Sequence, residues 1–373
     1  MQIDTQIKYD FQDVLIKPKR STLDSRQEVD LKRKYTFLNS KQEWYGTPII
    51  AANMDVTGTI EMEKALFKFS ACTALHKHYD IQVLKNLFEN HKELIPYIFV
   101  TIGQNNNKSN GGITFLKLLQ QFYGDNPINI CMDVANGYAP QFAESISHIR
   151  NEFPKSIIMA GNVATPEMVQ ELLIAGADII KIGTGPGSVC TTRIKTGVGY
   201  PQLSCIIECA EAAHGMGGHV CADGGCKIPA DVCKAFGAGA DFVMLGGMLA
   251  GTDQCEGEWV YEYQEHEDFQ SILDTEPQSV LVRASGKKIG LKFYGMSSKD
   301  AMDKYSGGVA DYRTSEGKCV TVDYKGPVED IIKDILGGLR SACTYVGARK
   351  LKHFSKCCTF IRCLRTHNDV FGS

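Results

Sequence analysis

The stretch ADIIKIGTGPGSVCTTR, residues 177–193, combines the two features that decide the fold. Its first part, 177–182, is a short apolar run typical of a strand buried in a parallel sheet. The Gly-x-Gly-x-Gly run at 183–187 then allows a tight, irregular turn with positive φ angles. This turn presents Cys190 at the carboxyl end of the strand, which is where α/β sheets and barrels carry their chemistry.

Cys190 is followed by Thr191, Thr192 and Arg193. Hydroxyl groups and a cation beside a thiol suit a nucleophile. Cysteine is also among the most frequently buried residue types, so a structural Cys190 is the alternative. The glycine loop is rich in backbone carbonyls and has no carboxylate, so it either holds a monovalent cation or is simply a shaped turn.

The same alternation of apolar runs and helix-like segments continues on both sides of this stretch. Eight strands, each followed by a helix or loop, predict an α/β fold of the (β/α)8 TIM-barrel type. A doubly wound open sheet is the alternative, and the absence of Gly-x-Gly-x-x-Gly near the start argues against it. The expected strands are 48–52, 69–75, 96–102, 128–132, 156–160, 177–182, 219–222 and 241–245.

Helices are expected between these strands at 61–68, 82–91, 113–122, 140–151, 166–175, 204–214 and 229–236, and a last one at 329–342. Thr165 is predicted to cap the helix that opens with Pro166, because proline suits the first helical position. Ser204 is predicted to cap the helix that follows the Cys190 loop.

We expect one catalytic barrel domain over 1–373, with its strands at about 47–247. Residues 252–282 contain nine acidic side chains and no lysine or arginine, which indicates a solvated, partly disordered excursion. The stretch at about 288–325 is too long for an ordinary connection, so an active-site flap is expected. A helix and a basic, cysteine-containing tail complete the chain at 328–373.

The composition is that of an ordinary soluble globular protein, with 43% hydrophobic and 22% charged residues. A formal charge of −3 gives no footprint for nucleic acid or membranes. None of the 14 cysteines forms a Cys-x-x-Cys pair, so a zinc ribbon and a thioredoxin-type motif are both unsupported. With no apolar signal segment, a reduced cytoplasmic location is expected.

Polar groups follow several of the expected strands. Asp223-Gly-Gly and Gly246-Gly247 come after the seventh and eighth strands, where TIM barrels often bind phosphate. Ordinary tight turns are the alternative for each pair. Asp223 suits sugar hydroxyls, because an ionised carboxylate only accepts hydrogen bonds. Asp133 and Asn162 face the same mouth, and Lys77 is either a surface charge or a partner for a cofactor phosphate.

Seven motifs resemble those of one enzyme family. They are GPGSVCTTR at 185–193, TGVGYPQ at 196–202, DGG at 223–225, FVMLGG at 242–247, YGMS at 294–297, SEGK at 315–318 and GGLRSACTY at 337–345. On these motifs the chain is identified as a member of the IMP dehydrogenase/GMP reductase family, and CTTR followed by TGVGYPQ resembles the GMP reductase branch. The likeness covers nearly the whole chain, although the acidic run at 252–282 departs from the family pattern.

The resemblance implies that the protein reduces GMP to IMP with NADPH and releases ammonia, as part of purine salvage. It also implies a potassium ion and a homotetramer, with no nucleic-acid or membrane partner. An IMP dehydrogenase without CBS modules, converting IMP to XMP with NAD, is the alternative. The short segment after the second strand leaves no room for a CBS insertion there.

The resemblance also implies roles for individual residues. The catalytic residues would be Cys190, Thr192 and Glu316, with Cys190 attacking purine C2 and the other two assisting the departure of ammonia. The residues that hold GMP would be Asp223, Gly224, Gly225, Gly246, Gly247, Gly295, Met296, Ser297, Arg313, Thr314, Ser315 and Gly317. The residues that hold NADPH, some of them from a neighbouring subunit, would be Ser25, Arg26, Lys77, Asp133, Val134, Ala135, Thr184, Gly185, Met296, Tyr312, Arg313, Ser341, Ala342, Cys343 and Thr344. The potassium loop would comprise Gly185, Gly187, Cys190 and Arg193.

Two other classes of protein remain as alternatives to this reductase. One is a flavin- or phosphate-binding barrel in which Cys190 is structural. The other is a purine-binding regulator without activity, against which the set of Cys190, Thr192 and Glu316 argues.

Overall fold

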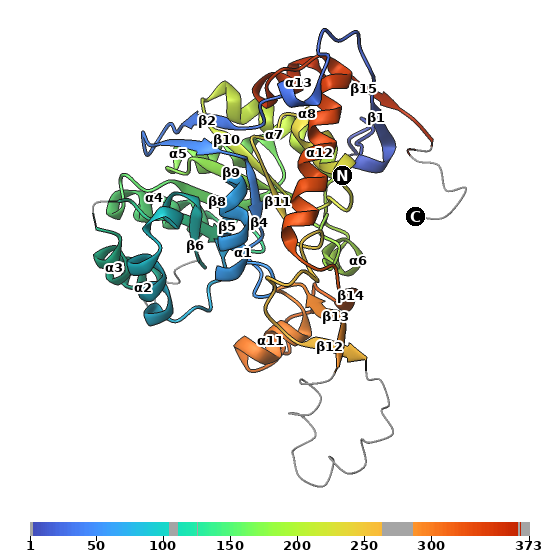
Figure 1. The fold of residues 1–373 in the computed structure, drawn as a ribbon. Coiled ribbons are helices and arrows are strands. Elements are labelled where there is room, and N and C mark those ends of the chain that lie inside the picture. The colour runs from blue at the N-terminus through green and yellow to red at the C-terminus, as the bar shows by residue number, and fades with distance from the viewer. Residues whose placement is uncertain (1–2, 104–110, 125, 263–285, 365, 367–373) are drawn as a thin grey trace, which may run out of the picture.

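Eight parallel strands close into a barrel in the computed structural model, which describes residues 3–103, 111–124, 126–262, 286–364 and 366 (Figure 1). They follow one another around the barrel in chain order, and the eighth pairs with the first. The TIM-barrel prediction is therefore confirmed. The strands are β4 (Ile49–Ala51), β5 (Cys72–Leu75), β6 (Ile98–Ile102), β7 (Asn129–Asp133), β8 (Ile158–Val163), β9 (Ile179–Ile182), β10 (His219–Asp223) and β11 (Phe242–Leu245).

The inside of the barrel is a packed core. Side chains alternate between the two faces of a strand, so one residue or two from each strand point inward. All eight strands contribute to one buried cluster, which includes Ile50, Cys72, Phe99, Cys131, Met159, Ile179, Cys221 and Phe242. On β9 the next residue on the same face as Ile179 is Lys181, which places a lysine in the barrel above this apolar layer.

A hairpin that the sequence did not predict closes the amino-terminal end of the barrel. It consists of β2 (Arg33–Thr36) and β3 (Glu43–Gly46), which pair antiparallel. Tyr35 and Trp44 belong to the same buried cluster as the barrel interior. The Tyr35 hydroxyl donates a 2.6 Å hydrogen bond to the carbonyl of Asp241, just before β11.

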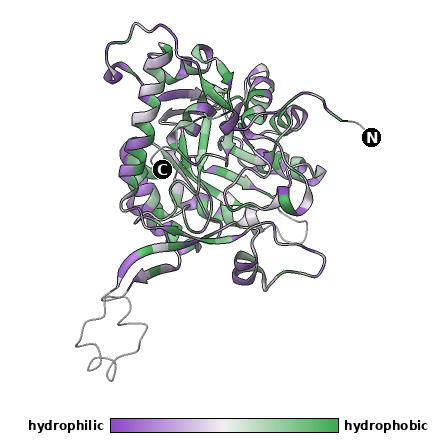
Figure 2. Ribbon diagram, turned by 90° about the vertical axis from the view of Figure 1, so that its right-hand side faces the viewer, coloured by the Kyte–Doolittle hydropathy of each residue, from purple (hydrophilic) through white to green (hydrophobic). Residues whose placement is uncertain are grey.

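Helices cover the outside of the barrel in the expected alternation. They are α1 (Ile60–Leu66), α2 (Ile81–Asn90), α3 (Gly111–Tyr123), α4 (Pro140–Glu152), α5 (Pro166–Ile174), α7 (Gln202–Gly215) and α8 (Pro229–Gly237), with short 3-10 turns η1 (Phe11–Asp13), η2 (Arg26–Glu28), η3 (Phe67–Phe69) and η4 (Lys92–Tyr97). Figure 2 shows hydrophobic residues along the strands and mixed residues on these helices. Among the described residues, no helix is both long and apolar enough to cross a membrane.

The two predicted helix caps had different outcomes. Thr165 is at the N-cap position of α5, with Pro166 at the first helical position, as predicted, but its side chain makes no capping hydrogen bond. The prediction for Ser204 is wrong, because α7 already begins at Gln202, after Pro201. The Ser204 hydroxyl instead accepts a 2.8 Å hydrogen bond from the backbone N–H of Tyr9, so it anchors the N-terminal segment.

A small antiparallel sheet lies beyond the carboxyl end of the barrel (Figure 1). It contains β12 (Trp259–Glu262), β13 (Lys287–Tyr294) and β14 (Cys319–Asp323), and α11 (Lys299–Ser306) lies between the last two strands in the chain. The expected flap is therefore largely regular structure. In 252–262 the acidic side chains Asp253, Glu256, Glu258 and Glu262 are exposed, as expected of a solvated stretch. The stretch is nevertheless part of the fold, because Thr252 and Cys255 are buried and β12 pairs with β13. Residues 263–282 of that stretch lie outside the described residues.

The C-terminal segment ties the two ends of the chain together. Helix α12 runs from Val328 to Val346, four residues further than predicted, and Gly347 ends it with a φ of 77°. After α13 (Leu351–Cys357), the short strand β15 (Phe360–Arg362) pairs antiparallel with β1 (Val14–Ile16). The predicted tail is therefore partly a strand in a two-stranded sheet.

Candidate active site

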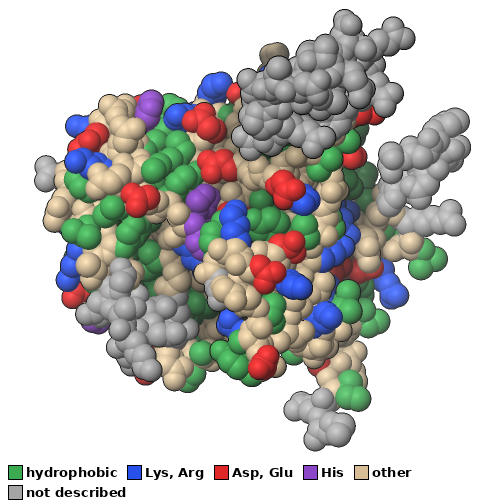
Figure 3. Space-filling model, turned by 90° about the horizontal axis from the view of Figure 1, so that it is seen from below, with side chains coloured by type: hydrophobic (Ala, Val, Ile, Leu, Met, Phe, Trp, Pro, Cys, Tyr) green, Lys and Arg blue, Asp and Glu red, His purple; other side chains and the backbone are tan. Residues whose placement is uncertain are grey.

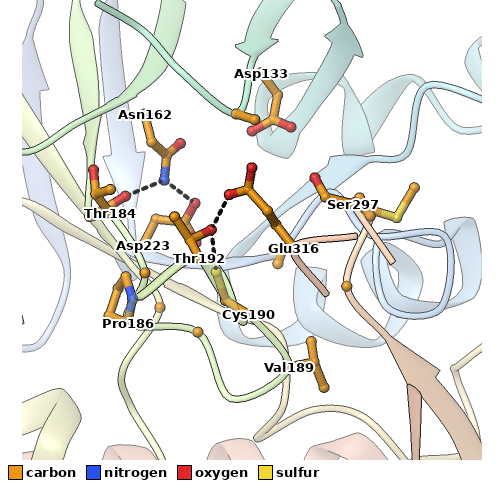
Figure 4. A pocket seen from close by; sticks show the side chains of 18 of the residues that line it. Asp133, Asn162, Thr184, Pro186, Val189, Cys190, Thr192, Asp223, Ser297 and Glu316 are labelled. Carbon is orange, nitrogen blue, oxygen red and sulfur yellow. Dashed lines mark hydrogen bonds between the residues drawn. The ribbon is translucent and has the colours of Figure 1, made fainter. Parts of the chain in front are cut away.

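A pocket of about 250 Å3 lies where the carboxyl ends of the barrel strands meet the small sheet (Figure 4). Its walls come from the loops after β4, β7, β8, β9 and β10 and from the segments around 296 and 316. Lining it are Ala52, Asn53, Met54, Asp133, Val134, Ala135, Asn162, Lys181, Gly183, Thr184, Gly185, Pro186, Gly187, Val189, Cys190, Thr192, Asp223, Gly224, Gly295, Met296, Ser297 and Glu316.

Cys190, Thr192 and Glu316 form one hydrogen-bonded chain inside this pocket. The Cys190 thiol donates to Thr192 Oγ1 at 3.2 Å, and the Thr192 hydroxyl donates to Glu316 Oε2 at 2.7 Å (Figure 4). The backbone holds the same arrangement, because the N–H of Thr191 donates to the carbonyl of Glu316 at 2.8 Å. The structure thus brings together a thiol, a hydroxyl and a carboxylate from two distant segments.

Arg193 and the N-terminal segment hold the loop that carries Cys190 in place. Gly185 has a φ of 79°, and a Cβ there would lie 2.6 Å from Cγ of Arg193. The glycine therefore allows the Arg193 side chain to pack directly against the backbone of the loop. The guanidinium of Arg193 donates to Asp10 at 3.1 Å, and Asp10 also accepts the backbone N–H of Gln202 at 2.9 Å. The N-terminal segment therefore supports the nucleophile loop through Asp10.

A cluster of polar groups around the buried Lys181 also lines the pocket. The Lys181 ammonium bonds to a carboxylate oxygen of Asp133 and lies 3.3 Å from one of Asp223. Asn162 donates to Asp223 Oδ2 at 2.9 Å and to the carbonyl of Gly183 at 3.2 Å. Burial would raise the pKa of Asp133, but the charge and hydrogen bond of Lys181, together with Asn53 and Lys77, outweigh burial and hold that pKa below its usual value.

The segment predicted to be a flap reaches the pocket through Gly295, Met296, Ser297 and Glu316. Other predicted residues of this segment do not line it. Tyr312, Arg313 and Thr314 are exposed. Ser315 and Gly317 are half-buried next to Glu316, where the Ser315 hydroxyl donates to the carbonyl of Gly317 at 3.0 Å.

The small sheet is anchored to the barrel through Asp55, just after the pocket residues Asn53 and Met54. Oδ2 of Asp55 accepts hydrogen bonds from Tyr294 at 2.6 Å, Tyr305 at 2.7 Å and Lys304 at 3.0 Å. Burial would raise the pKa of Asp55, but these three donors outweigh it and lower that pKa. Tyr294 directly precedes the pocket residues 295–297, so Asp55 fixes their position.

The glycines predicted to bind phosphate lie at the strand ends as expected, but not in one cavity. Gly224 lines the pocket, whereas Gly247 lines a neighbouring cavity of about 430 Å3 together with Lys227, Lys318 and Lys325. Gly225 and Gly246 line neither. Figure 3 shows acidic and basic side chains interspersed over the face that carries the small sheet. A phosphate bound in the cavity beside Gly247 would depend on Lys227, Lys318 and Lys325 and on nearby backbone N–H groups.

The residues predicted to hold a dinucleotide fall into two groups. Asp133, Val134, Ala135, Thr184, Gly185 and Met296 line the pocket. Lys77 is exposed beyond β5, close enough for its charge to lower the pKa of Asp133. Ser341 and Ala342 line a separate cavity of about 500 Å3. Arg26 begins η2, which Ser25 caps, and η2 contacts α12, the helix that carries Thr344 and the fully buried Cys343.

A family model for the IMP dehydrogenase / GMP reductase domain matches residues 8–271 and 273–368. The chain belongs to this family. It is 54% identical over 371 residues to a protein named GMP reductase 1 from Homo sapiens, covering 100% of this chain and 99% of the relative. A protein named GMP reductase from Aeromonas hydrophila is 50% identical over 374 residues, covering 100% of this chain and 99% of the relative.

Asn53, Met54 and Lys181 line the pocket of this family member although the sequence did not single them out. Asn53 and Met54 directly follow the strand predicted at 48–52. Their position after a barrel strand could have indicated that they line the pocket. Lys181 is the only charged residue between Ile179 and Ile182, and a charge inside a buried strand usually has partners. Asp133 and Asn162, by contrast, lie at strand ends in the pocket as predicted.

Proposed function

We propose that the protein is a GMP reductase, which converts GMP to IMP with NADPH and releases ammonia. The observation that carries this proposal is the chain from the Cys190 thiol through Thr192 to Glu316. The family match and the names of relatives about half identical to this chain support the same activity. In this family the alternative, oxidation of IMP, has no such support from those names.

Cys190 is the nucleophile in this proposal. As its sulfur attacks C2 of the purine, the thiol proton passes to Thr192, which passes its own to Glu316, along the two hydrogen bonds already formed. Glu316 then holds a proton that the same path can return. The amino group on C2 takes up this proton from Glu316 through Thr192 and leaves as ammonia, and a thioimidate on Cys190 remains.

A reduced nicotinamide cofactor, when bound, supplies the hydride that C2 of this thioimidate accepts. The C–S bond then breaks, IMP is released, and the Cys190 thiolate regains a proton. Water must be absent between the two steps, because it would convert the thioimidate to XMP. Gly295, Met296 and Ser297 cover the pocket from the small sheet, and Asp55 holds them there.

Asp223 and Gly224 are the proposed contacts for the ribose and phosphate end of GMP. Oδ1 of Asn162 is buried and has no hydrogen-bond partner among the described residues, so it is available to a ligand hydroxyl. The φ of Gly224 is 85°, and a Cβ there would lie 3.1 Å from Pro186 and 3.2 Å from the backbone nitrogen of Gly187. This glycine keeps the nucleophile loop close to the end of β10.

Asp133, Val134 and Ala135 would hold the nicotinamide end of NADPH. The carboxylate of Asp133 faces Glu316 across the pocket, so a ligand between them lies against the Cys190 loop (Figure 4). Ser25, Arg26, Ser341 and Thr344 lie away from this pocket, which supports their serving the adenosine end in a homotetramer. That NADPH rather than NADH is the cofactor is part of the proposal.

Potassium is proposed to bind the carbonyl groups of the Cys190 loop. The carbonyl of Gly187 accepts the N–H of Cys190 at 3.1 Å, and that of Arg193 accepts the N–H of Gly197 at 3.1 Å. A carbonyl oxygen has two lone pairs, so each keeps one for a cation. The Arg193 guanidinium is already paired with Asp10, so this residue would contribute its carbonyl only.

The test follows the absorbance of NADPH at a fixed protein concentration with GMP, and in parallel the reduction of NAD with IMP. We expect NADPH to be consumed only with GMP, with one ammonia and one IMP formed per NADPH. Steady formation of XMP from IMP with NAD would show that the protein is the dehydrogenase instead.

A further inference from the structure

Lys181 occupies an unusual position for a lysine: its side chain is only 1% exposed, inside the barrel beneath the pocket. Three oxygens surround its ammonium. They belong to Asp133 on β7, to Asn53 after β4 at 3.2 Å, and to Asp223 on β10 at 3.3 Å. The ammonium donates hydrogen bonds to Asp133 and Asn53 and forms an ion pair with Asp223, so the groups nearest to it are all protein groups.

The electrostatics keep this lysine charged. Burial alone would lower the pKa of Lys181, but the two carboxylates outweigh burial and raise it well above its usual value. The charged groups around Asp133 are Lys181 on β9, Asp223 on β10 and Lys77 beyond β5, and Asn53 adds a neutral amide. One cation thus stabilises two carboxylates on different strands.

The geometry also fixes which carboxylate oxygens the protein engages. Lys181 engages Oδ1 of Asp133 and Oδ2 of Asp223, and Asn162 donates to that same Oδ2 of Asp223. Both carboxylates line the pocket, so a ligand there can reach them. Their side chains are 33% and 22% exposed, whereas Lys181 is hidden behind them.

We propose that Lys181 is a positioning residue shared by the two ligand sites: it orients Asp223 toward the sugar hydroxyls of the nucleotide substrate and Asp133 toward the nicotinamide end of the cofactor. This inference rests on the proposed function. Removal of this single side chain, which is only 1% exposed, should therefore weaken the binding of both ligands.

The experiment compares the wild type with Lys181→Met, which keeps the length of the side chain and removes its charge, and with Lys181→Gln, which keeps a donor. Calorimetry gives the Kd of GMP alone and of NADP+ alone. We expect both values to rise about 10- to 100-fold in Lys181→Met, since the charged hydrogen bond to Asp133 and the ion pair with Asp223 are lost together. Lys181→Gln should lose less for each ligand.

A second readout separates positioning from a general loss of stability. Without the ammonium, Asp133 takes up a proton more readily, so the ratio of the NADP+ Kd in Lys181→Met to that in the wild type should grow from pH 7 to pH 5. Arg150→Met is the control, because it breaks a 2.7 Å buried ion pair with Asp178 near the amino end of β9. It should lower the Tm and leave both Kd values unchanged.

Two results would overturn the proposal: a folded Lys181→Met protein in which either Kd stays within about twofold of the wild type, or failure of both Lys181 variants to fold, which would assign the residue to the fold alone. The wild type is also assayed for NADPH consumption with GMP. If it shows none, the proposed function fails, while the two Kd values still decide whether Lys181 serves both carboxylates.

Discussion

The Thr192 hydroxyl donates a 2.7 Å hydrogen bond to Glu316, which lies 124 positions further along the chain. Thr192 begins the short helix α6 (Thr192–Thr196) after β9, whereas Glu316 belongs to the segment between α11 and β14. The bond therefore joins the barrel to the small sheet above it. The proposed proton path exists only when the two parts are in contact. Catalysis therefore depends on the position of the small sheet.

Replacing Cys190 by alanine should abolish turnover and leave GMP binding within about threefold, because the proposed ribose and phosphate contacts lie on β10 and beyond. The measurement is NADPH consumption together with the Kd of GMP by calorimetry. Cys319→Ala is the matched control, since Cys319 is an exposed cysteine on β14 close to Glu316 in sequence. Appreciable activity in Cys190→Ala would show that Cys190 is structural.

Glu316→Gln should slow the release of ammonia by about 10²–10⁴-fold, which is the usual contribution of general acid–base catalysis. Glutamine keeps the shape of the side chain but cannot hold the proton that Thr192 delivers. Hydride transfer involves no amine and should be slowed less. Rapid-quench measurement of ammonia gives the first step, and deuterated NADPH reports the second through its isotope effect.

Thr192→Val tests the same path at its middle, because valine has a similar shape and no hydroxyl. The rate of ammonia release in Thr192→Val should fall by about as much as in Glu316→Gln. The double variant should be only slightly slower than either single variant. Equal slowing of both chemical steps in Glu316→Gln, or of neither, would remove Glu316 from the acid role.

The sequence predicted the barrel and the Cys190 loop well because both depend on local patterns. The apolar runs that mark the strands are continuous, and Thr192 lies two residues from Cys190. Glu316 could be connected to them only through the family motif, since no local pattern brings a residue from 124 positions away. Asp133 and Asn162 were found because polar residues at strand ends share one mouth.

The missed features have a different physical cause. Lys181 lies within an apolar run, and its three partners come from β4, β7 and β10, whose register the sequence does not show. The hairpin β2–β3 has a largely polar composition, and its buried aromatic side chains Tyr35, Phe37 and Trp44 join the cluster inside the barrel. Its alternation of aromatic and polar residues is a strand signal, but the basic run Lys32-Arg33-Lys34 overlaps the first strand and gives it a polar character.

The stretch between β12 and β13 should be dispensable for the chemistry. Glu262 and Lys287 are direct partners in the antiparallel pair, so a two-residue turn can join the strands in place of residues 263–286. Asn-Gly suits such a turn. We expect kcat within about threefold of the wild type, and no loss of GMP affinity, in NADPH assays.

The control for this shortened chain removes 259–286 instead, which deletes β12 as well and exposes the edge of β13. It should be less active, because Trp259 pairs with Leu291 in the sheet that carries residues 295–297. A folded, shortened chain without activity would mean that residues 263–286 take part in the reaction or in assembly.

Asp55→Asn should let water reach the thioimidate. Asparagine is neutral, so the ion pair with Lys304 is lost. Its amide oxygen is also a weaker hydrogen-bond acceptor for Tyr294 and Tyr305 than a carboxylate, so residues 295–297 lose their anchor. Chromatography of the products should then show XMP beside IMP, with KM for GMP raised. Asp303→Asn, at an exposed position on α11, should form no XMP. An Asp55→Asn protein that makes IMP alone at the normal rate would contradict this role.

Glu63 gives a pH dependence of stability that can be tested apart from activity. It is fully buried on α1, where burial raises its pKa well above the usual value and nearby groups of Thr73 offset only part of that effect. The folded protein therefore keeps a proton that the unfolded chain releases above about pH 4.3. This contribution to stability is complete below that pH and is lost as the pH rises toward the folded pKa, by up to about 1.4 kcal/mol per pH unit.

Glu63→Gln removes this contribution to the pH dependence of the free energy of unfolding, because an amide does not titrate. The difference in Tm between Glu63→Gln and the wild type should therefore shift in favour of the variant as the pH rises from 4 to 7, measured by calorimetry. Other titrating groups, including Asp55, cancel in the comparison. Glu61→Gln, an exposed residue on the same helix, is the control and should show no such trend. A constant difference between Glu63→Gln and the wild type over this range would mean that Glu63 is ionised inside the folded protein.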